Sequence, residues 1–246
     1  MRWILLRGWA REARHWGEFP RALQAAFPRA EVGALDLPGN GSRCRERSPA
    51  RLGDMVDDLR KSVRADGASK LHLLGLSLGA MACVDWACRF PREVAACVLI
   101  NTSLRPFSGF HERLRPANYA RILKLLFITD AARREAGILA LTSSLVTGNL
   151  AQTWALYAQE RPVSKTNALR QLIAAARFRA PEKAPAVPVL VLASASDRLV
   201  DPRCSEALAR RWGVPLLLHP RAGHDLTLDD GPWVAAQVKR WLRGLQ

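Results

Sequence analysis

The sequence has few cysteines, and their spacing argues against a covalent or metal framework. The five cysteines are odd in number, include no CxxC pair, and three of them lie inside apolar stretches, where cysteine usually behaves as a small buried hydrophobe. No group of His and Cys has the spacing of zinc ligands. We therefore expect neither a disulfide framework nor a bound metal.

Long hydrophobic segments and internal repeats are also missing. The first apolar stretch, residues 3–6, is too short for the hydrophobic region of a signal peptide and far too short to cross a bilayer. No self-similarity with a period of about 20 to 50 residues is visible, which excludes solenoids and arrays. The sequence predicts a cytoplasmic protein without a membrane span.

Acids and lysines are scarce beside arginine. Lys and Arg together number 37 against 22 for Asp and Glu, a formal net charge of +15, and only six of the 37 are lysines. The basic residues are spread along the chain and form no run of about five to eight residues of the nucleic-acid-binding type. We expect no nucleic-acid partner, whereas an acidic protein partner suits this charge.

The rest of the composition fits one folded domain with a sizeable core: 246 residues, 49% hydrophobic and 24% charged. Short apolar runs alternate with longer stretches of helical spacing, and such alternation predicts a parallel sheet with helices on both faces. The predicted strands are residues 3–6, 32–35, 71–74, 94–100, 187–193 and 214–218. The predicted helices are residues 16–27, 51–64, 78–89, 204–212 and 233–245.

Residues 105–181 break this alternation. They contain no convincing strand, and helical patterns cover 120–127, 131–145 and 150–159. Ligands of open α/β sheets bind at the carboxyl ends of the strands, and an insertion after the strand 94–100 would lie over that edge. The sequence therefore predicts a core of residues 1–104 and 182–246 and a helical lid of residues 105–181.

The sharpest chemical signal is the pentapeptide Gly75-Leu76-Ser77-Leu78-Gly79, between a predicted strand and a helix rich in small residues. A serine hydroxyl is a poor nucleophile at pH 7 and must be both exposed and deprotonated by a base. A tight strand-to-helix turn exposes it, and flanking glycines avoid a collision there. The alternative interpretation is an ordinary glycine-rich turn.

Together with this turn at Ser77, the nucleophile elbow, four further motifs resemble those of the α/β-hydrolase superfamily, in the same order and over almost the whole chain. The resemblance implies the α/β-hydrolase fold, with a minimal, mostly parallel sheet of about six strands, since the chain starts directly in its first predicted strand. The four motifs are the first loop at residues 5–9, the segment Asp-Leu-Pro-Gly-Asn-Gly-Ser at 36–42, which is similar to the D-x-P-G-x-G-x-S loop of the family, the turn 194–200 with Asp197, and Gly223-His224.

The chain order Ser77, Asp197, His224 is the order of a catalytic triad in this fold. The resemblance implies that His224 is the general base for Ser77 and that Asp197 orients its imidazole. Two other acids remain open for the third role. Asp201 precedes Pro202 at an expected helix start, where Asp is a favoured N-cap, and Asp225 points away from the ring of its neighbour if that loop is extended.

The resemblance further implies an oxyanion hole made by the backbone N–H groups of Trp9 and Leu78. Trp9, Phe107 and Phe110 are candidate substrate-binding residues, although apolar side chains at such positions more often belong to a core. The first loop departs from most relatives, because Arg7-Gly8 stands where they have His-Gly. A longer, permanently charged side chain there puts the conformation of the loop in question.

In size and motif order the sequence resembles the small serine carboxylesterases of the pimeloyl-carrier-protein methyl esterase type. The resemblance implies a serine hydrolase without cofactor that cleaves a carboxylic ester or thioester through an acyl-enzyme intermediate. The substrate would be a small-molecule or carrier-bound acyl ester, and the arginine-rich insertion suits an acidic carrier protein.

Two alternatives stay open. The same triad supports acyl transfer, perhydrolysis or a lyase reaction, which differ in pocket shape and water access. A non-catalytic module of this fold would instead hold an anionic ligand or an acidic partner. A dehalogenase or an epoxide hydrolase is disfavoured, because either would need aspartate at position 77.

Overall fold

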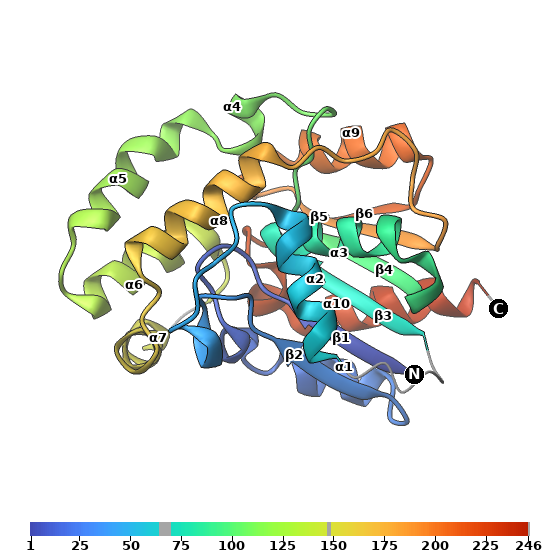
Figure 1. Cartoon of the computed structure of the whole chain (residues 1–246), viewed down its shortest axis with the longest axis horizontal. Coiled ribbons are helices and arrows are strands. Elements are labelled where there is room, and N and C mark those ends of the chain that lie inside the picture. Colours follow the sequence, from blue (N-terminus) through green and yellow to red (C-terminus); the bar gives the residue numbers. More distant parts are fainter. Residues whose placement is uncertain (64–69, 147–148, 246) are drawn as a thin grey trace.

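The computed structural model describes residues 1–63, 70–146 and 149–245 of the chain. Its centre is one sheet of six parallel strands in the order β2-β1-β3-β4-β5-β6 (Figure 1). This arrangement confirms the predicted six-stranded parallel sheet. The strands are β1 (Arg2–Leu6), β2 (Glu31–Leu35), β3 (Leu71–Leu76), β4 (Val94–Ile100), β5 (Val189–Ser194) and β6 (Leu216–His219).

Helices cover both faces of the sheet, which is why its strands are continuous apolar runs. Side chains alternate between the faces: Trp3 and Leu5 of β1 pack in one buried cluster, and Ile4 and Leu6 pack in the other. The first cluster is closed by α1 (Phe19–Ala26) and α10 (Leu226–Arg243), and the second by α2 (Leu52–Ser62), α3 (Leu78–Arg89) and α9 (Arg203–Trp212).

Two of the helices that cover the sheet differ most from the prediction, each for a local reason. The predicted helix 16–27 is divided into a 3-10 turn, Ala13–Trp16, and α1, because Gly17 between them has a φ of +54°. The predicted helix 233–245 begins earlier, at Leu226. Two helical segments join there across a kink at Asp230, whose Oδ1 accepts the N–H of Trp233 at 3.0 Å.

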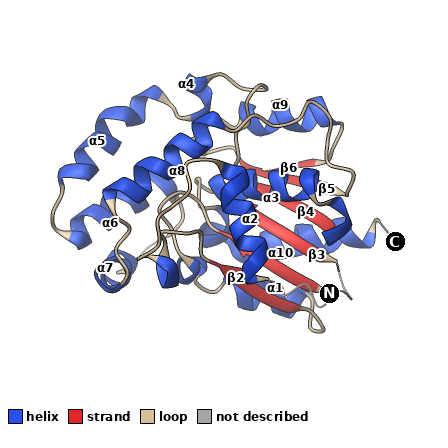
Figure 2. Cartoon of the chain, viewed as in Figure 1, coloured by secondary structure: helices blue, strands red, loops and turns tan. Residues whose placement is uncertain are grey.

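The segment between β4 and β5 carries helices beside the carboxyl ends of the strands, as Figure 2 shows. Sequence patterns had not singled out its last helix, because the buried face of that helix carries the polar side chains Asn167 and Gln171. None of the helices in the described ranges combines the length and the hydropathy needed to span a bilayer. The helices of the segment are α4 (Phe110–Arg113), α5 (Tyr119–Phe127), α6 (Ala131–Thr142), α7 (Leu150–Glu160) and α8 (Lys165–Arg177).

Candidate active site

Ser77 occupies the turn between β3 and α3 in a conformation that few non-glycine residues adopt. Its φ of 56° and ψ of −114° lie outside the helical and extended regions, and its side chain is partly exposed. The flanking glycines are sterically required. A Cβ on Gly79 would lie 2.0 Å from the carbonyl oxygen of Leu6, and one on Gly75 would lie 2.4 Å from the carbonyl carbon of Gly79.

The end of β4 fixes the backbone of Ser77. The N–H of Ser77 donates to the carbonyl of Ile100 at 2.9 Å, and the Oγ1 of Thr102 donates to the carbonyl of Ser77 at 3.1 Å. The elbow is therefore held on both sides of the exposed hydroxyl by residues that follow the neighbouring strand.

His224 and Asp197 form a buried pair at the same edge of the sheet. The Nδ1 of His224 lies 2.7 Å from Oδ2 of Asp197, and both residues are almost fully buried. A carboxylate only accepts hydrogen bonds, so Nδ1 carries the proton and Nε2 is left free to act as a base. The second oxygen of Asp197 accepts the backbone N–H groups of Leu199 at 2.8 Å and Val200 at 3.0 Å, which fixes the carboxylate.

The other two acids considered for this role have different partners. Both carboxylate oxygens of Asp225 bind the guanidinium of Arg7. Asp201 accepts the N–H of Arg203 at 3.0 Å at the start of α9 and pairs with Arg115 at 3.2 Å.

Burial and charge act in opposite directions on His224. Burial disfavours the charged imidazolium, but the negative charge and hydrogen bond of Asp197, with a contribution from Asp225, outweigh it. The pKa of His224 is therefore raised above its ordinary value, although the positive charge of Arg7 lowers it.

Residues 100–102 join the backbone of Ser77 to the backbone of His224. Ile100 and Thr102 bind the backbone of Ser77, and the side chain of Asn101 binds the carbonyl of His224 at 2.7 Å. No hydrogen bond joins the Oγ of Ser77 to His224 within the described residues. The distance between nucleophile and base is often longer in free enzymes and shortens when substrate binds.

The first loop lies directly against this elbow. A Cβ on Gly8 would be 3.4 Å from the Cβ of Ser77, so the residue before Trp9 lies directly beside the nucleophile. Leu78 is the first residue of α3, where backbone N–H groups lack intrahelical acceptors. This geometry is compatible with the predicted oxyanion donors Trp9 and Leu78.

Helix α8 forms hydrogen bonds with the first loop. The indole Nε1 of Trp9 donates to the carbonyl of Ala168 at 2.8 Å, and the N–H of Ala10 donates to Oε1 of Gln171 at 3.0 Å. The amide of Gln171 also donates to Asn40 at 2.7 Å and to Ser48 at 3.1 Å, and both of these residues are fully buried. Helix α8 is thus joined to the loop by a buried polar network.

The three predicted substrate-binding residues lie in different surroundings. Trp9 is half-buried against the core, Phe107 packs edge-on against Trp212 with ring centres 5.8 Å apart, and Phe110 is 68% exposed beside Tyr119. The role of these three residues in binding substrate stays a prediction.

Asn101 and Gln171 are site residues that sequence reasoning missed. Asn101 could have been suspected, because it is polar and directly follows a fully apolar strand at the edge where Ser77 lies. Gln171 gave no such signal, since a glutamine in a helix is usually solvated.

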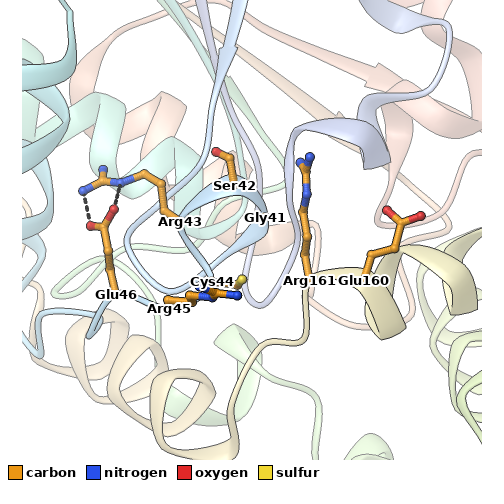
Figure 3. Close-up of a pocket in the computed structure, with 8 residues that line it drawn as sticks. All are labelled: Gly41, Ser42, Arg43, Cys44, Arg45, Glu46, Glu160 and Arg161. Carbon is orange, nitrogen blue, oxygen red and sulfur yellow. Dashed lines mark hydrogen bonds and ion pairs between the residues drawn. The ribbon is translucent and has the colours of Figure 1, made fainter.

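A pocket of about 460 Å³ is lined by the loop 41–46 and by Glu160 and Arg161 at the end of α7 (Figure 3). Two of its three arginines have partners: Arg43 binds Glu46 and Asp58, and Arg161 lies 3.6 Å from a carboxylate oxygen of Glu12. We interpret it as a salt-bridged junction between core and insertion.

Comparison with known proteins agrees with this architecture. The chain belongs to the alpha/beta hydrolase fold family, which it matches over residues 4–230. A 102-residue segment, 42% of the chain, is 31% identical to the pimeloyl-[acyl-carrier protein] methyl ester esterase of Chromobacterium violaceum and spans only 37% of that esterase. A candidate carbamate hydrolase, RutD of Caulobacter segnis, is 28% identical over 98% of this chain and 91% of its own length.

Among solved structures, a candidate non-heme bromoperoxidase, BpoC of Mycobacterium tuberculosis, matches with a TM-score of 0.78. The match covers 100% of this chain and 92% of that chain at 20% sequence identity. At this level of identity the likeness shows the fold alone.

Proposed function

We propose that the protein is a serine hydrolase that cleaves a carboxylic ester or thioester through an acyl-enzyme at Ser77. The observation that carries the proposal is the buried Asp197–His224 pair at the carboxyl edge of the sheet where the turn exposes Ser77. Membership of a hydrolase-fold family supports hydrolysis, and the type of bond cleaved is part of the proposal.

In the first step the Oγ of Ser77 attacks the carbonyl carbon while its proton passes to Nε2 of His224. The displaced electron pair moves onto the carbonyl oxygen, which accepts hydrogen bonds from the backbone N–H groups of Trp9 and Leu78. A single donor of this kind contributes about 100- to 1000-fold in rate. Asp197 stabilises the imidazolium that has formed.

The intermediate then collapses and the carbonyl double bond re-forms. The bond to the leaving oxygen or sulfur breaks, and the leaving group takes the proton from His224. Water repeats both steps on the acyl-enzyme, releases the acid and returns Ser77 to its starting form.

The test is turnover of p-nitrophenyl acetate, butyrate and octanoate together with labelling by a fluorophosphonate probe. Ser77→Ala should abolish both, while Ser196→Ala, which changes an exposed serine on the turn next to Asp197, should leave both unchanged. An activated carbamate ester is added, because the similarity to RutD extends over nearly the whole chain. Folded wild-type protein that takes up no probe would contradict the proposal and favour the non-catalytic binding module.

A carrier-bound ester is the substrate that the charge of the insertion favours. Residues 105–181 carry twelve Lys and Arg against four acids. Three of these arginines, Arg105, Arg177 and Arg179, are exposed near the end of α8, where Arg105 pairs with Arg179 in an isolated β-bridge. An acidic carrier protein would be attracted to such a surface, and the attraction would weaken with salt.

The triple variant Arg105→Glu, Arg177→Glu, Arg179→Glu tests this refinement. We expect KM for an ester on an acidic carrier to rise about tenfold or more, whereas KM for the same ester on free pantetheine stays unchanged. Arg240→Glu on α10 is the control for a changed net charge elsewhere on the molecule. An equal rise for both substrates would contradict carrier recognition by this surface.

A further inference from the structure

The charge of Arg7 is neutralised by a residue next to the proposed base. Its Nη1 lies 3.0 Å from Oδ1 of Asp225 and its Nη2 lies 2.5 Å from Oδ2, a two-pronged pair whose side chains are 3% and 5% exposed. The guanidinium also lies over the ring of Trp16, 4.8 Å from its centre. These contacts fix the positions of Arg7 and Asp225, and the ion pair keeps both side chains charged.

The Arg7–Asp225 pair connects two loops of the proposed site, the first loop with Trp9 and the loop with His224. Arg7 precedes Gly8 and Trp9 in the first loop, and its carbonyl lies 2.7 Å from the position that a Cβ on Gly79 would take. Asp225 follows His224 directly, and its N–H donates to the carbonyl of Thr142 at the end of α6 at 2.6 Å. A displacement of either residue would move a loop that carries a reacting group.

We propose that Arg7 and Asp225 are positioning residues that hold the loop of the oxyanion donor Trp9 in register with the loop of the base His224. The inference rests on the proposed function, since it assigns the pair a role in that reaction. The two residues act through Trp9 and His224 and contact no reacting atom.

The two charges of the pair also oppose each other at the imidazole. Asp225 raises the pKa of His224 and Arg7 lowers it, while the charge of Asp197 makes the larger contribution that raises it. Burial alone would raise the pKa of Asp225, but the charge and hydrogen bonds of Arg7, with smaller contributions from His224 and Arg11, hold it below its ordinary value. The two effects on His224 have opposite signs, so removal of one member leaves the effect of the other unopposed.

The first measurement is kinetic and uses Arg7→Met, Arg7→Lys and Asp225→Asn. We expect kcat to fall about 10- to 100-fold in each, because a misplacement of about 1 Å has an effect of that size, while KM changes by less than about threefold. Arg60→Met is the matched control, because it removes a two-pronged pair with Glu93 at the opposite, amino-terminal edge of β4. It should leave kcat unchanged.

The second measurement does not depend on activity. An NMR titration of His224, assigned with His224→Gln, should show its pKa rising in Arg7→Met and falling in Asp225→Asn. Arg7→Lys keeps the charge and should leave the pKa close to that of the wild type although its kcat is low. In the double variant Arg7→Met, Asp225→Asn the two changes oppose each other, so its pKa should lie between those of the two single variants while kcat stays low.

If the Arg7–Asp225 pair contributed only to stability, its variants would give different values of kcat and of the His224 pKa. If variants that melt cooperatively keep wild-type kcat, or if both single substitutions move the pKa of His224 in the same direction, the positioning role is wrong. A wild-type protein without esterase activity would contradict the proposed function, and the opposite pKa shifts would still decide whether the pair acts on His224. The double variant Arg7→Met, Asp225→Asn leaves no buried charge of the pair without its partner, so it provides a variant for the kcat measurement even if a single variant does not fold.

Discussion

The side-chain amide of Asn101 donates to the backbone carbonyl of His224 at 2.7 Å, across 123 positions of sequence. The same amide lies 3.0 Å from the Oγ of Ser194 at the end of β5, and its oxygen accepts the N–H of Ser194 at 2.8 Å. Asn101 itself has a φ of 45°, a conformation that asparagine tolerates better than most residues. One side chain therefore joins the ends of β4 and β5 to the histidine loop.

Asn101→Leu should reduce both activity and stability. It leaves the N–H of Ser194 and the carbonyl of His224 without their partner and places a branched side chain at positive φ, so unfolding should become easier by about 2 to 4 kcal/mol. We expect kcat to fall at least about tenfold, measured with p-nitrophenyl butyrate, and the denaturation midpoint to drop. Asn101→Asp keeps the acceptor for Ser194 and should lose less stability. An unchanged kcat in Asn101→Leu would contradict a role of this residue in placing His224.

The raised pKa of His224 predicts the acid limb of the pH profile. The base must be neutral, so kcat/KM should fall as the pH drops through a value above the ordinary 6.5 of histidine. The contribution of His224 to stability has the opposite pH dependence. A raised pKa in the folded state stabilises the protein at pH values below the unfolded pKa, and this contribution is lost as the pH rises through the folded value.

Asp197→Asn tests the cause of this shift. It removes the charge that favours the imidazolium, so the pKa of His224 should fall, and kcat should drop by up to about 10⁴-fold. The measurement is kcat/KM from pH 5 to 9 in both proteins. An acid limb at the same pH in Asp197→Asn would show that another group controls the profile.

Glycine at position 79 is predicted to be irreplaceable by any larger residue. A Cβ there would lie 2.0 Å from the carbonyl oxygen of Leu6, a rigid backbone atom, so Gly79→Ala should destabilise the protein by about 2 kcal/mol or more. Gly53→Ala in α2 is the control, because its Cβ would meet only the flexible end of Arg89 at 3.1 Å, and it should be neutral or stabilising by up to about 1 kcal/mol. Urea denaturation compares the two, and equal midpoints would contradict the predicted collision.

Gln171 is predicted to connect α8 to the first loop, which carries Trp9. Gln171→Leu removes its bonds to Ala10, Asn40 and Ser48 and leaves their buried polar groups unpaired, a loss of about 1 to 3 kcal/mol. Because Ala10 follows Trp9, kcat should fall as well. Leu172→Ala on the same helix is 40% exposed and should change stability by less than about 0.5 kcal/mol. Wild-type kcat in a folded Gln171→Leu protein would show that the loop does not depend on α8.

The sheet and the elbow could be predicted because their signals are local. Six apolar runs gave the six strands, since a strand covered on both faces must be apolar throughout. The helix α3 was predicted with its observed bounds, Leu78–Arg89, because small and apolar residues fill it from the turn onward. The helix α8 was not singled out, because its buried face is held by hydrogen bonds of Asn167 and Gln171 rather than by an apolar stripe.

The sequence by itself determined the parallel sheet, the strained turn at Ser77 and the order of Ser77, Asp197 and His224 along the chain. Each of these follows from neighbouring residues, whose spacing decides which backbone conformations and faces are available. The tertiary structure alone decided which carboxylate meets His224 and what neutralises Arg7. Arg7 and Asp225 are 218 positions apart, and a pairing at that separation depends on how the loops meet at the sheet edge. Buried polar groups take whichever partner the fold brings within about 3 Å, and no local pattern encodes that choice.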